Sequence, residues 1–264
     1  MPDQEHEANI NAIAEMILRS RRLVIFTGAG ISTESGIPDF RSPGGIWDRF
    51  DPDDFTLSKF LSSEDSRRKQ WYIFREGLLS DKAVPNPAHI AIAELHRMGR
   101  LDCVITQNID NLHQKAGVPD ESVFELHGNM KWARCLECGR RFPFPEIKQQ
   151  LEQGVDIPDC PACRGMLKPD IVMFEEQLPY DVLREASRRA VAADACVVIG
   201  STLTVYPAAL MPRYAVRSGA ELAIINLTGT PLDHEASVVI NARAGETMAV
   251  VIQKVKEKAG FTEE

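Results

Sequence analysis

The chain has 264 residues, of which 44% are hydrophobic and 26% are charged, and its formal net charge is −8. This composition is ordinary for a globular protein and excludes the fibrous and intrinsically disordered classes. The negative charge, without a long run of lysine or arginine, argues against a protein that mainly binds the phosphate backbone, so we expect no direct nucleic-acid binding.

The N-terminal sequence gives an expectation about location. It reads Met-Pro-Asp-Gln-Glu-His-Glu, which lacks the positive and apolar regions of a secretory signal peptide. No apolar run approaches the roughly 18 residues of a membrane span. We therefore expect a cytoplasmic protein without a membrane partner.

Helical and strand patterns alternate along most of the chain. Apolar residues recur at helical spacing from Ile10 to Leu18, and an apolar strand follows at Leu23–Thr27. Further strands are expected at Cys103–Thr106, Val123–Leu126, Ala195–Gly200, Leu222–Asn226 and Ser237–Ile240. Helical patterns occupy Ala88–Met98, Tyr180–Ala192, Ala208–Arg217 and Thr247–Lys258. The alternation predicts an α/β fold, a Rossmann-like parallel sheet covered on both faces.

Two stretches interrupt this alternation and are interpreted as insertions. Residues 46–85 are aromatic-rich and helical in pattern, and residues 131–168 hold two cysteine pairs. The Rossmann-like domain would then comprise residues 1–45, 86–130 and 169–264. A cleft between a large domain and a smaller inserted one is a common place for a ligand.

The first strand ends in a glycine-rich turn formed by Gly28, Ala29 and Gly30. Glycines there allow a pyrophosphate to approach the backbone, and the N-terminus of a following helix offers free N–H groups. Thr33, however, stands where the dinucleotide fingerprint has its third glycine. On its own, the turn leaves open both a nucleotide site and a tight strand-to-helix connection.

Four of the six cysteines are spaced as metal ligands. Cys135 and Cys138 form one close pair, and Cys160 and Cys163 form the other. Two such pairs supply four thiolates at tetrahedral geometry for one structural zinc ion, which leaves no open position for catalysis. The other two cysteines lie in apolar strands and are expected to be small buried hydrophobic residues.

These features occur together with three further motifs, in an order that resembles the sirtuin family. The motifs are Gly36-Ile-Pro-Asp39-Phe40-Arg41, Thr106-Gln-Asn-Ile-Asp110 with the residues up to Gly117, and Glu125-Leu-His127-Gly128. The resemblance covers nearly the whole chain. It implies an NAD-dependent protein lysine deacetylase or deacylase that transfers the acyl group to ADP-ribose and releases nicotinamide and free lysine. Acylated-lysine proteins or peptides are the implied partners.

The resemblance assigns the catalytic roles. His127 matches the histidine that serves as base for a ribose hydroxyl, which suits a side chain whose pKa is ordinarily near neutrality. Asn108 matches the asparagine that places the ribose and water. Asp110, with the backbone of Ile109, matches the group that holds the nicotinamide amide. The remaining implied NAD contacts are Gly28, Ala29, Gly30, Thr33, Asp39, Phe40, Arg41, Gln107, Gly200, Ser201, Thr202, Asn226 and Leu227.

The resemblance also implies a substrate wall, with one departure. Val172 and Phe174 match residues that line the acyl-lysine tunnel, in a segment that pairs with the substrate peptide. Glu175 replaces the glycine that the family usually has there. A glutamate favours a negative φ and adds a carboxylate, so we hypothesise a preference for basic peptides.

Two alternative enzymatic functions remain open at this point. Tyr72 and Arg75 have the Tyr-x-x-Arg form of sirtuins that accept succinyl- or malonyl-lysine, where an arginine can bind the distal carboxylate. An ordinary helix with a solvated arginine explains the same residues. NAD-dependent mono-ADP-ribosyl transfer in the same pocket is the other alternative. A zinc-ribbon nucleic-acid binder would explain the four cysteines alone.

Overall fold

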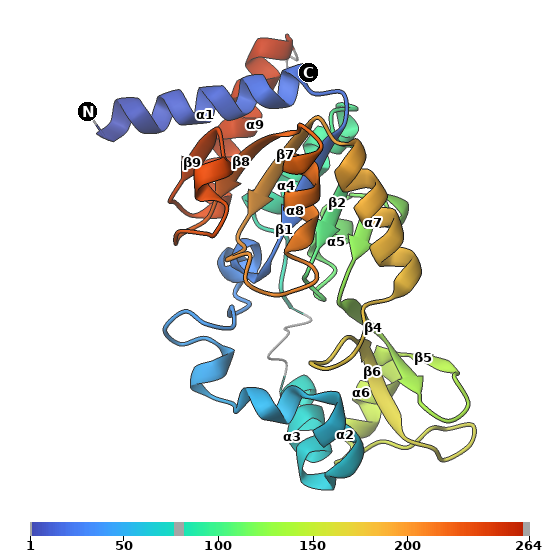
Figure 1. The fold of residues 1–264 in the computed structure, drawn as a ribbon. Helices are drawn as coiled ribbons and strands as arrows, with labels where there is room; N and C mark the ends of the chain where they lie inside the picture. The colour runs from blue at the N-terminus through green and yellow to red at the C-terminus, as the bar shows by residue number, and fades with distance from the viewer. Residues whose placement is uncertain (1, 77–81, 261–264) are drawn as a thin grey trace.

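The computed structural model describes residues 2–76 and 82–260, with side chains from residue 4 onward. It has two lobes, a larger one that carries both ends of the described chain and a smaller one below it (Figure 1). No helix of residues 2–76 and 82–260 is both long enough and apolar enough to cross a bilayer.

The large lobe is built on a six-stranded parallel sheet. Its spatial order is β3-β2-β1-β7-β8-β9, and every neighbouring pair is parallel. The strands are β1 (Leu23–Thr27), β2 (Cys103–Thr106), β3 (Val123–Glu125), β7 (Ala195–Ile199), β8 (Glu221–Ile225) and β9 (Val238–Ile240). All six predicted strands are therefore confirmed, together with the Rossmann-like architecture.

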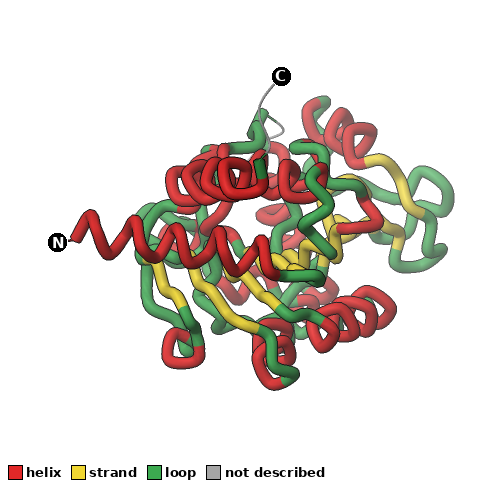
Figure 2. Tube along the Cα trace, turned by 90° about the horizontal axis from the view of Figure 1, so that it is seen from above, coloured by secondary structure: helices red, strands yellow, loops and turns green. Residues whose placement is uncertain are grey.

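Helices cover both faces of this sheet (Figure 2). One face packs against α1 (Pro2–Arg19), α4 (Pro87–Arg97) and α9 (Ala244–Ala259), and the other against α7 (Tyr180–Ala192) and α8 (Leu210–Arg217). Successive strand residues point to opposite faces, so Ile25 belongs to one core and Phe26 to the other. The lone cysteines, Cys103 and Cys196, are buried in the second core, as expected.

The small lobe combines both predicted insertions. Its antiparallel sheet has the order β5-β4-β6, and α2, α3 and α6 pack beside it. These elements are β4 (Gly128–Cys135), β5 (Arg141–Pro143), β6 (Leu167–Ile171), α2 (Leu57–Ser62), α3 (Glu64–Arg75) and α6 (Phe144–Glu152). The ring of Trp71 from the first insertion stacks on Phe144 from the second, with centroids 6.4 Å apart. The two insertions thus share one hydrophobic core.

The small sheet reaches beyond the predicted boundaries of the cysteine-bearing insertion. Gly128 pairs with Ile171, so β4 and β6 extend outside residues 131–168 at both ends. Short helical turns complete the fold: η1 (Ala29–Ser35), η2 (Ile46–Asp48), η3 (Pro52–Phe55), α5 (Leu112–Lys115), η4 (Asp120–Ser122) and η5 (Asp233–Glu235).

Candidate active site

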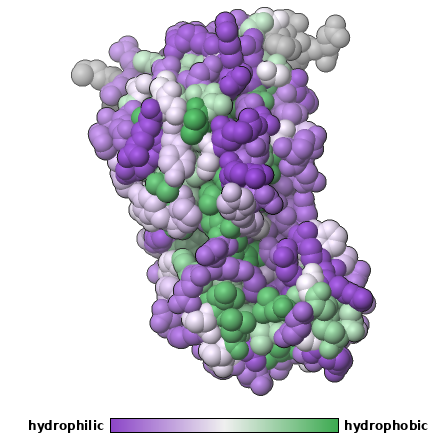
Figure 3. All heavy atoms as spheres, turned by 45° about the vertical axis from the view of Figure 1, so that its right-hand side comes forward, coloured by the Kyte–Doolittle hydropathy of each residue, from purple (hydrophilic) through white to green (hydrophobic). Residues whose placement is uncertain are grey.

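A cavity of about 350 Å³ lies between the edge of the parallel sheet and the small lobe. On the face shown in Figure 3, apolar residues gather at the narrow waist between the lobes. Every predicted catalytic and NAD-contacting residue lines this cavity, and so do Val172 and Phe174. Segments far apart in the sequence therefore converge on one site.

The cavity lies where the strand order of the sheet reverses. From β1 the chain continues to β2 and β3 on one side and later returns to β7 on the other. The loops after β1 and β7 meet there, and the Gly30 N–H donates to the Gly200 carbonyl at 2.9 Å. In open α/β sheets, the crevice beyond the carboxyl ends of strands at such a point is the usual ligand site.

The glycines of this crevice are needed for packing as well as for access to a ligand. A Cβ on Gly28 or Gly30 would lie 2.8 Å from backbone atoms of Gly200, and Gly200 itself has a φ of 64°. The segment after the turn is the 3₁₀ helix η1, which corrects the expectation of an ordinary helix N-terminus. The tight connection is real, and it also lines the cavity.

His127 is held so that one ring nitrogen is committed to the protein. Its Nδ1 lies 3.0 Å from the Gln107 carbonyl oxygen, which can only accept, so Nδ1 carries the proton. Nε2 is then left with its lone pair, in a residue that lines the cavity. Burial lowers the pKa of His127, which favours the neutral ring that a general base requires.

Asn108 is oriented by the loop after β1. Its Nδ2 donates to the Gly28 carbonyl at 3.1 Å and to the Ser32 hydroxyl at 3.2 Å, and its backbone N–H donates to Thr106 Oγ1. Because the protein holds the amide protons, Oδ1 is the atom left for a ligand. Asn108 is buried, so this orientation is protected from exchange with water.

Asp110 shares this network. Its Oδ2 accepts from Ser32 Oγ at 2.7 Å, and its Oδ1 accepts from the Leu112 N–H at 2.9 Å. Burial raises the pKa of the carboxyl group, while these donors oppose that shift. Ser32 therefore connects Asn108 to Asp110, and it is a site residue that the sequence reasoning missed. Its position two residues after Gly30 in the glycine-rich turn was the available signal.

The opposite end of the cavity is polar. Gln107 Nε2 donates to Ser201 Oγ at 2.8 Å, and Asn226 Nδ2 donates to the Thr228 carbonyl at 2.7 Å. The first bond joins the loops after β2 and β7, and the second closes a turn within the loop after β8. Thr228 and Arg243 also line this end, although neither was predicted. Hydroxyl and amide groups here suit the ribose and base of a nucleotide.

The loop after η1 brings aromatic rings to the mouth of the cavity. The Asp39 carboxylate accepts from the N–H groups of Arg41 and Ser42, which closes a turn. The adjacent Phe40 ring packs on Trp47 with centroids 5.1 Å apart, and Trp47 lies 6.0 Å from Phe174. The predicted cofactor loop and the predicted substrate wall are thus in contact through Trp47.

The substrate wall is fixed by backbone hydrogen bonds to both lobes. The Val172 N–H donates to the His127 carbonyl at 2.8 Å, and the Phe174 N–H donates to the Phe55 carbonyl at 3.1 Å. Glu175 follows with a φ of 69°, so the expected negative φ is wrong. Hydrogen bonds to α2 override the local preference of glutamate.

The four predicted metal ligands come together in the small lobe. The sulfur atoms of Cys135, Cys138, Cys160 and Cys163 all lie within 4.8 Å of one another. The Cys135–Cys163 and Cys138–Cys160 sulfur pairs are 3.5 and 3.8 Å apart. Ligands about 2.3 Å from a tetrahedral zinc ion are roughly 3.8 Å from each other, so the site fits zinc.

A model of the Sir2 family matches residues 28–207. The chain belongs to the Sir2 family. It is 44% identical over 248 residues to the NAD-dependent protein deacetylase 1 of Pyrobaculum aerophilum, covering 94% of this chain and 95% of the relative. A solved Sir2 enzyme has a TM-score of 0.88 at 42% identity, covering 96% of this chain and 99% of the other. A Sir2 structure with a p53 peptide and NAD+ has a TM-score of 0.83 at 38% identity, covering 95% of this chain and 98% of the other.

Within this Sir2 fold, Tyr72 and Arg75 do not lie where the Tyr-x-x-Arg hypothesis places them. Helix α3 turns Gln70, Ile73 and Phe74 toward the large cavity, whereas Tyr72 and Arg75 line a separate cavity of about 270 Å³. The Arg75 guanidinium lies 5.0 Å from the Tyr72 ring centroid and 3.2 Å from a Glu76 carboxylate oxygen. Residues three or four positions apart share a face of a helix, so Tyr72 and Arg75 lie together on one face, while Gln70, Ile73 and Phe74 lie on another. The packing of Trp71 on Phe144 fixes the helix in this orientation.

Proposed function

We propose that the cavity between the lobes is the site at which this chain removes acyl groups from protein lysines, with His127 as the general base. The chain is an NAD-dependent protein lysine deacylase of the Sir2 family, and the products are nicotinamide, O-acyl-ADP-ribose and free lysine. The observation that carries the proposal is the hydrogen bond from His127 Nδ1–H to the Gln107 carbonyl, which leaves a basic Nε2 in the cavity.

The residues of the cavity fit NAD. The glycine crevice between β1 and β7 admits a diphosphate, and the polar end around Ser201 and Asn226 suits an adenosine. NAD, when bound, supplies a ribose whose bond to nicotinamide is cleaved and whose hydroxyl receives the acyl group. We assign the nicotinamide end to Asp110 and Ile109, beside the Ser32 hydroxyl.

The protein contributes position and proton transfer. His127 Nε2 accepts the proton of the ribose hydroxyl, and Asn108 Oδ1 orients the same ribose or the attacking water. Val172 and Phe174 form the wall against which an acyl-lysine lies, and the Trp47 ring covers the mouth. The apolar wall excludes water, which strengthens each of these polar contacts.

The four cysteines would hold one zinc ion in the small lobe. Because all four positions of a tetrahedral ion are taken by protein sulfur atoms, the metal has a structural role and takes no part in the reaction.

The proposal includes a cytoplasmic location, which is inferred from the sequence.

Deacetylation is the activity that we place first. Succinyl or malonyl removal through Tyr72 and Arg75 is not favoured, because these side chains line the other cavity. Mass spectrometry of the products after incubation with NAD and an acetyl-lysine peptide tests the assignment. We expect O-acetyl-ADP-ribose and deacetylated peptide in equal amounts. ADP-ribose attached to protein, or free ADP-ribose alone, would instead identify ADP-ribosyl transfer or NAD hydrolysis.

A further inference from the structure

Glu175 stands in a backbone conformation that residues with a side chain rarely adopt. Its φ of 69° lies in the left-handed region, where a glycine has no steric penalty. For other residues this conformation costs about 1–2 kcal/mol. It persists only where the surrounding structure fixes it, so the contacts of Glu175 show what holds it.

The first turn of α2 provides those contacts. Glu175 Oε2 accepts from the Ser58 N–H at 3.1 Å, while the preceding Phe174 carbonyl accepts from the Leu57 N–H at 2.9 Å. Two consecutive residues of the substrate wall therefore satisfy two consecutive N–H groups of one helix end. Both bonds form with Glu175 in the left-handed conformation.

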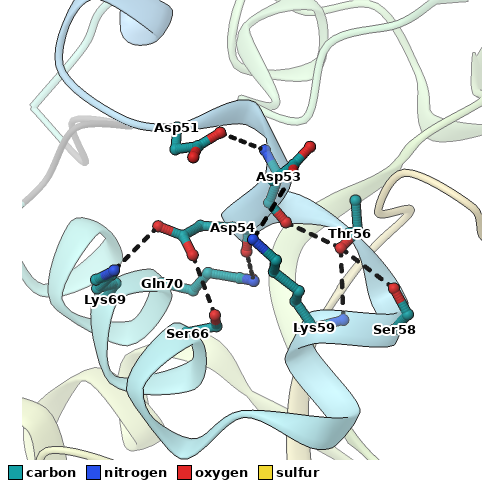
Figure 4. Close-up of polar contacts among 9 residues, drawn as sticks. All are labelled: Asp51, Asp53, Asp54, Thr56, Ser58, Lys59, Ser66, Lys69 and Gln70. Carbon is teal, nitrogen blue, oxygen red and sulfur yellow. Dashed lines mark hydrogen bonds and ion pairs between the residues drawn. The ribbon is translucent and has the colours of Figure 1, made fainter.

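The helix end that anchors Glu175 is itself rigidly supported (Figure 4). Thr56 Oγ1 donates to the Asp53 carbonyl at 2.9 Å, and Asp54 accepts from Ser66 Oγ at 3.1 Å on α3. Gln70 Nε2 also donates to the Asp54 carbonyl. The segment 51–58 is thus tied to α3, which fixes the position of the Ser58 N–H that binds the Glu175 carboxylate.

The negative charge of Glu175 is not cancelled by its anchors. The hydroxyl and N–H of Ser58 lower its pKa, and both donors are neutral, so the group is ionised at neutral pH. The neighbouring acidic groups differ in this respect. Glu176 lies 2.9 Å from Lys168 Nζ, Asp53 lies 3.7 Å from Lys59 Nζ and Asp54 lies 3.3 Å from Lys69 Nζ.

We propose that Glu175 is a specificity-determining residue whose fixed negative charge favours acyl-lysine peptides with a lysine or arginine beside the modified lysine. Glu175 lines the cavity directly after Phe174, a residue that is 44% exposed, so a peptide entering along this wall passes the carboxylate. A carboxylate already held by a hydrogen bond loses less side-chain freedom when a partner binds, so its charge is used more effectively. This inference rests on the proposed deacylase function.

The test compares two acetyl-lysine peptides that differ only in having lysine or glutamate next to the acetylated residue. The ratio of their kcat/KM values is measured for the wild type, Glu175→Gln and Glu175→Gly. Glutamine keeps an acceptor for Ser58 without the charge, and glycine also removes the strained φ. Glu152→Gln, which neutralises an exposed carboxylate on α6 outside the cavity wall, is the matched control.

We expect the wild type and Glu152→Gln to prefer the basic peptide by roughly three- to tenfold at low salt. Both Glu175 variants should bring the ratio close to one, and about 1 M salt should do the same to the wild type. An unchanged ratio in Glu175→Gln would overturn the inference while leaving the deacylase function intact. If the wild type turned over neither peptide, the function itself would be overturned, and this inference with it.

Discussion

The protonation state of His127 follows from the positions of its two ring nitrogens. Nδ1 is bound to the Gln107 carbonyl, and the site is largely buried, so the ring reaches the cavity as a neutral base. The neighbouring Asn108 and Asp110 are held by Ser32 in the same way. The proposed catalytic groups are therefore oriented by the protein before a ligand arrives, which reduces the entropic cost of reaching the reactive geometry.

The lowered pKa of His127 predicts the pH dependence of activity. The neutral form is required, and burial shifts the pKa below 6.5, so kcat/KM should stay level from pH 8 down to about 6.5 and fall only below it. Steady-state rates across this range would show the acid limb. Circular dichroism at each pH would separate titration from unfolding. A midpoint at or above pH 7 would contradict the assignment.

Local residue preferences explain part of the site. Gly28, Gly30 and the Gln-Asn-Ile-Asp string are recognisable because each needs a specific residue type at a specific position. The left-handed Glu175 was not predictable, because its conformation is imposed by N–H donors 117 positions away in the sequence. The orientation of α3 was not predictable either, since Tyr72 and Phe74 are both aromatic and packing alone decides which turns inward.

Among the elements, the junction of β1, η1 and β7 bears most directly on ligand binding. Gly200 has a φ of 64°, and a Cβ there would lie 2.2 Å from the Ile31 nitrogen. Any side chain at this position would push η1 away from the sheet edge. The loops that form the glycine crevice would then separate.

We therefore predict that Gly200→Ala lowers the free energy of unfolding by about 2 kcal/mol or more and raises the KM for NAD. Gly219→Ala is the matched control, since Gly219 has a φ of 95° but a Cβ added there would meet no neighbouring atom within 4 Å. Backbone strain alone should cost that variant about 1 kcal/mol. Urea denaturation measures the free energy of unfolding of both variants. Equal decreases in the two variants would show that the close approach at Gly200 is unimportant.

Some strands are easier to predict from the sequence than others. β1 and β7 are fully buried on both faces and read as continuous apolar runs, so they were predicted with the correct bounds to within a residue. β4 to β6 were not predicted. Most of β4 is only partly buried and it carries charged residues, so neither an apolar run nor a clean alternation marks it.

At the scale of the whole molecule, the zinc site and the cavity are linked through one hydrophobic cluster. Cys135 and Cys160 belong to the same hydrophobic cluster as Trp71 and Phe74, and Phe74 lines the cavity. A small lobe with so few core residues needs a further constraint to stay folded, and a metal ion is an effective one. Loss of the ion should therefore damage the site without touching a catalytic residue.

We predict that elemental analysis finds one zinc ion per chain. The Cys160→Ser variant should lose both the zinc ion and the deacylase activity. Far-ultraviolet circular dichroism should retain most of its signal, because the parallel sheet and its helices do not depend on the metal. Cys103→Ala, which removes a buried thiol from β2, is the control and should keep its zinc. A metal-free Cys160→Ser protein with full activity would refute this coupling.

In the proposed mechanism, NAD cleavage in the cavity depends on an acylated lysine and on His127. Nicotinamide release with an acetyl-lysine peptide, with the unmodified peptide and without peptide measures it most directly, in the wild type and in His127→Ala. We predict release by the wild type only with the acetylated peptide, and a rate about 10²- to 10⁴-fold lower in a folded His127→Ala protein. Release without an acylated peptide, or a His127→Ala variant as active as the wild type, would contradict the claim.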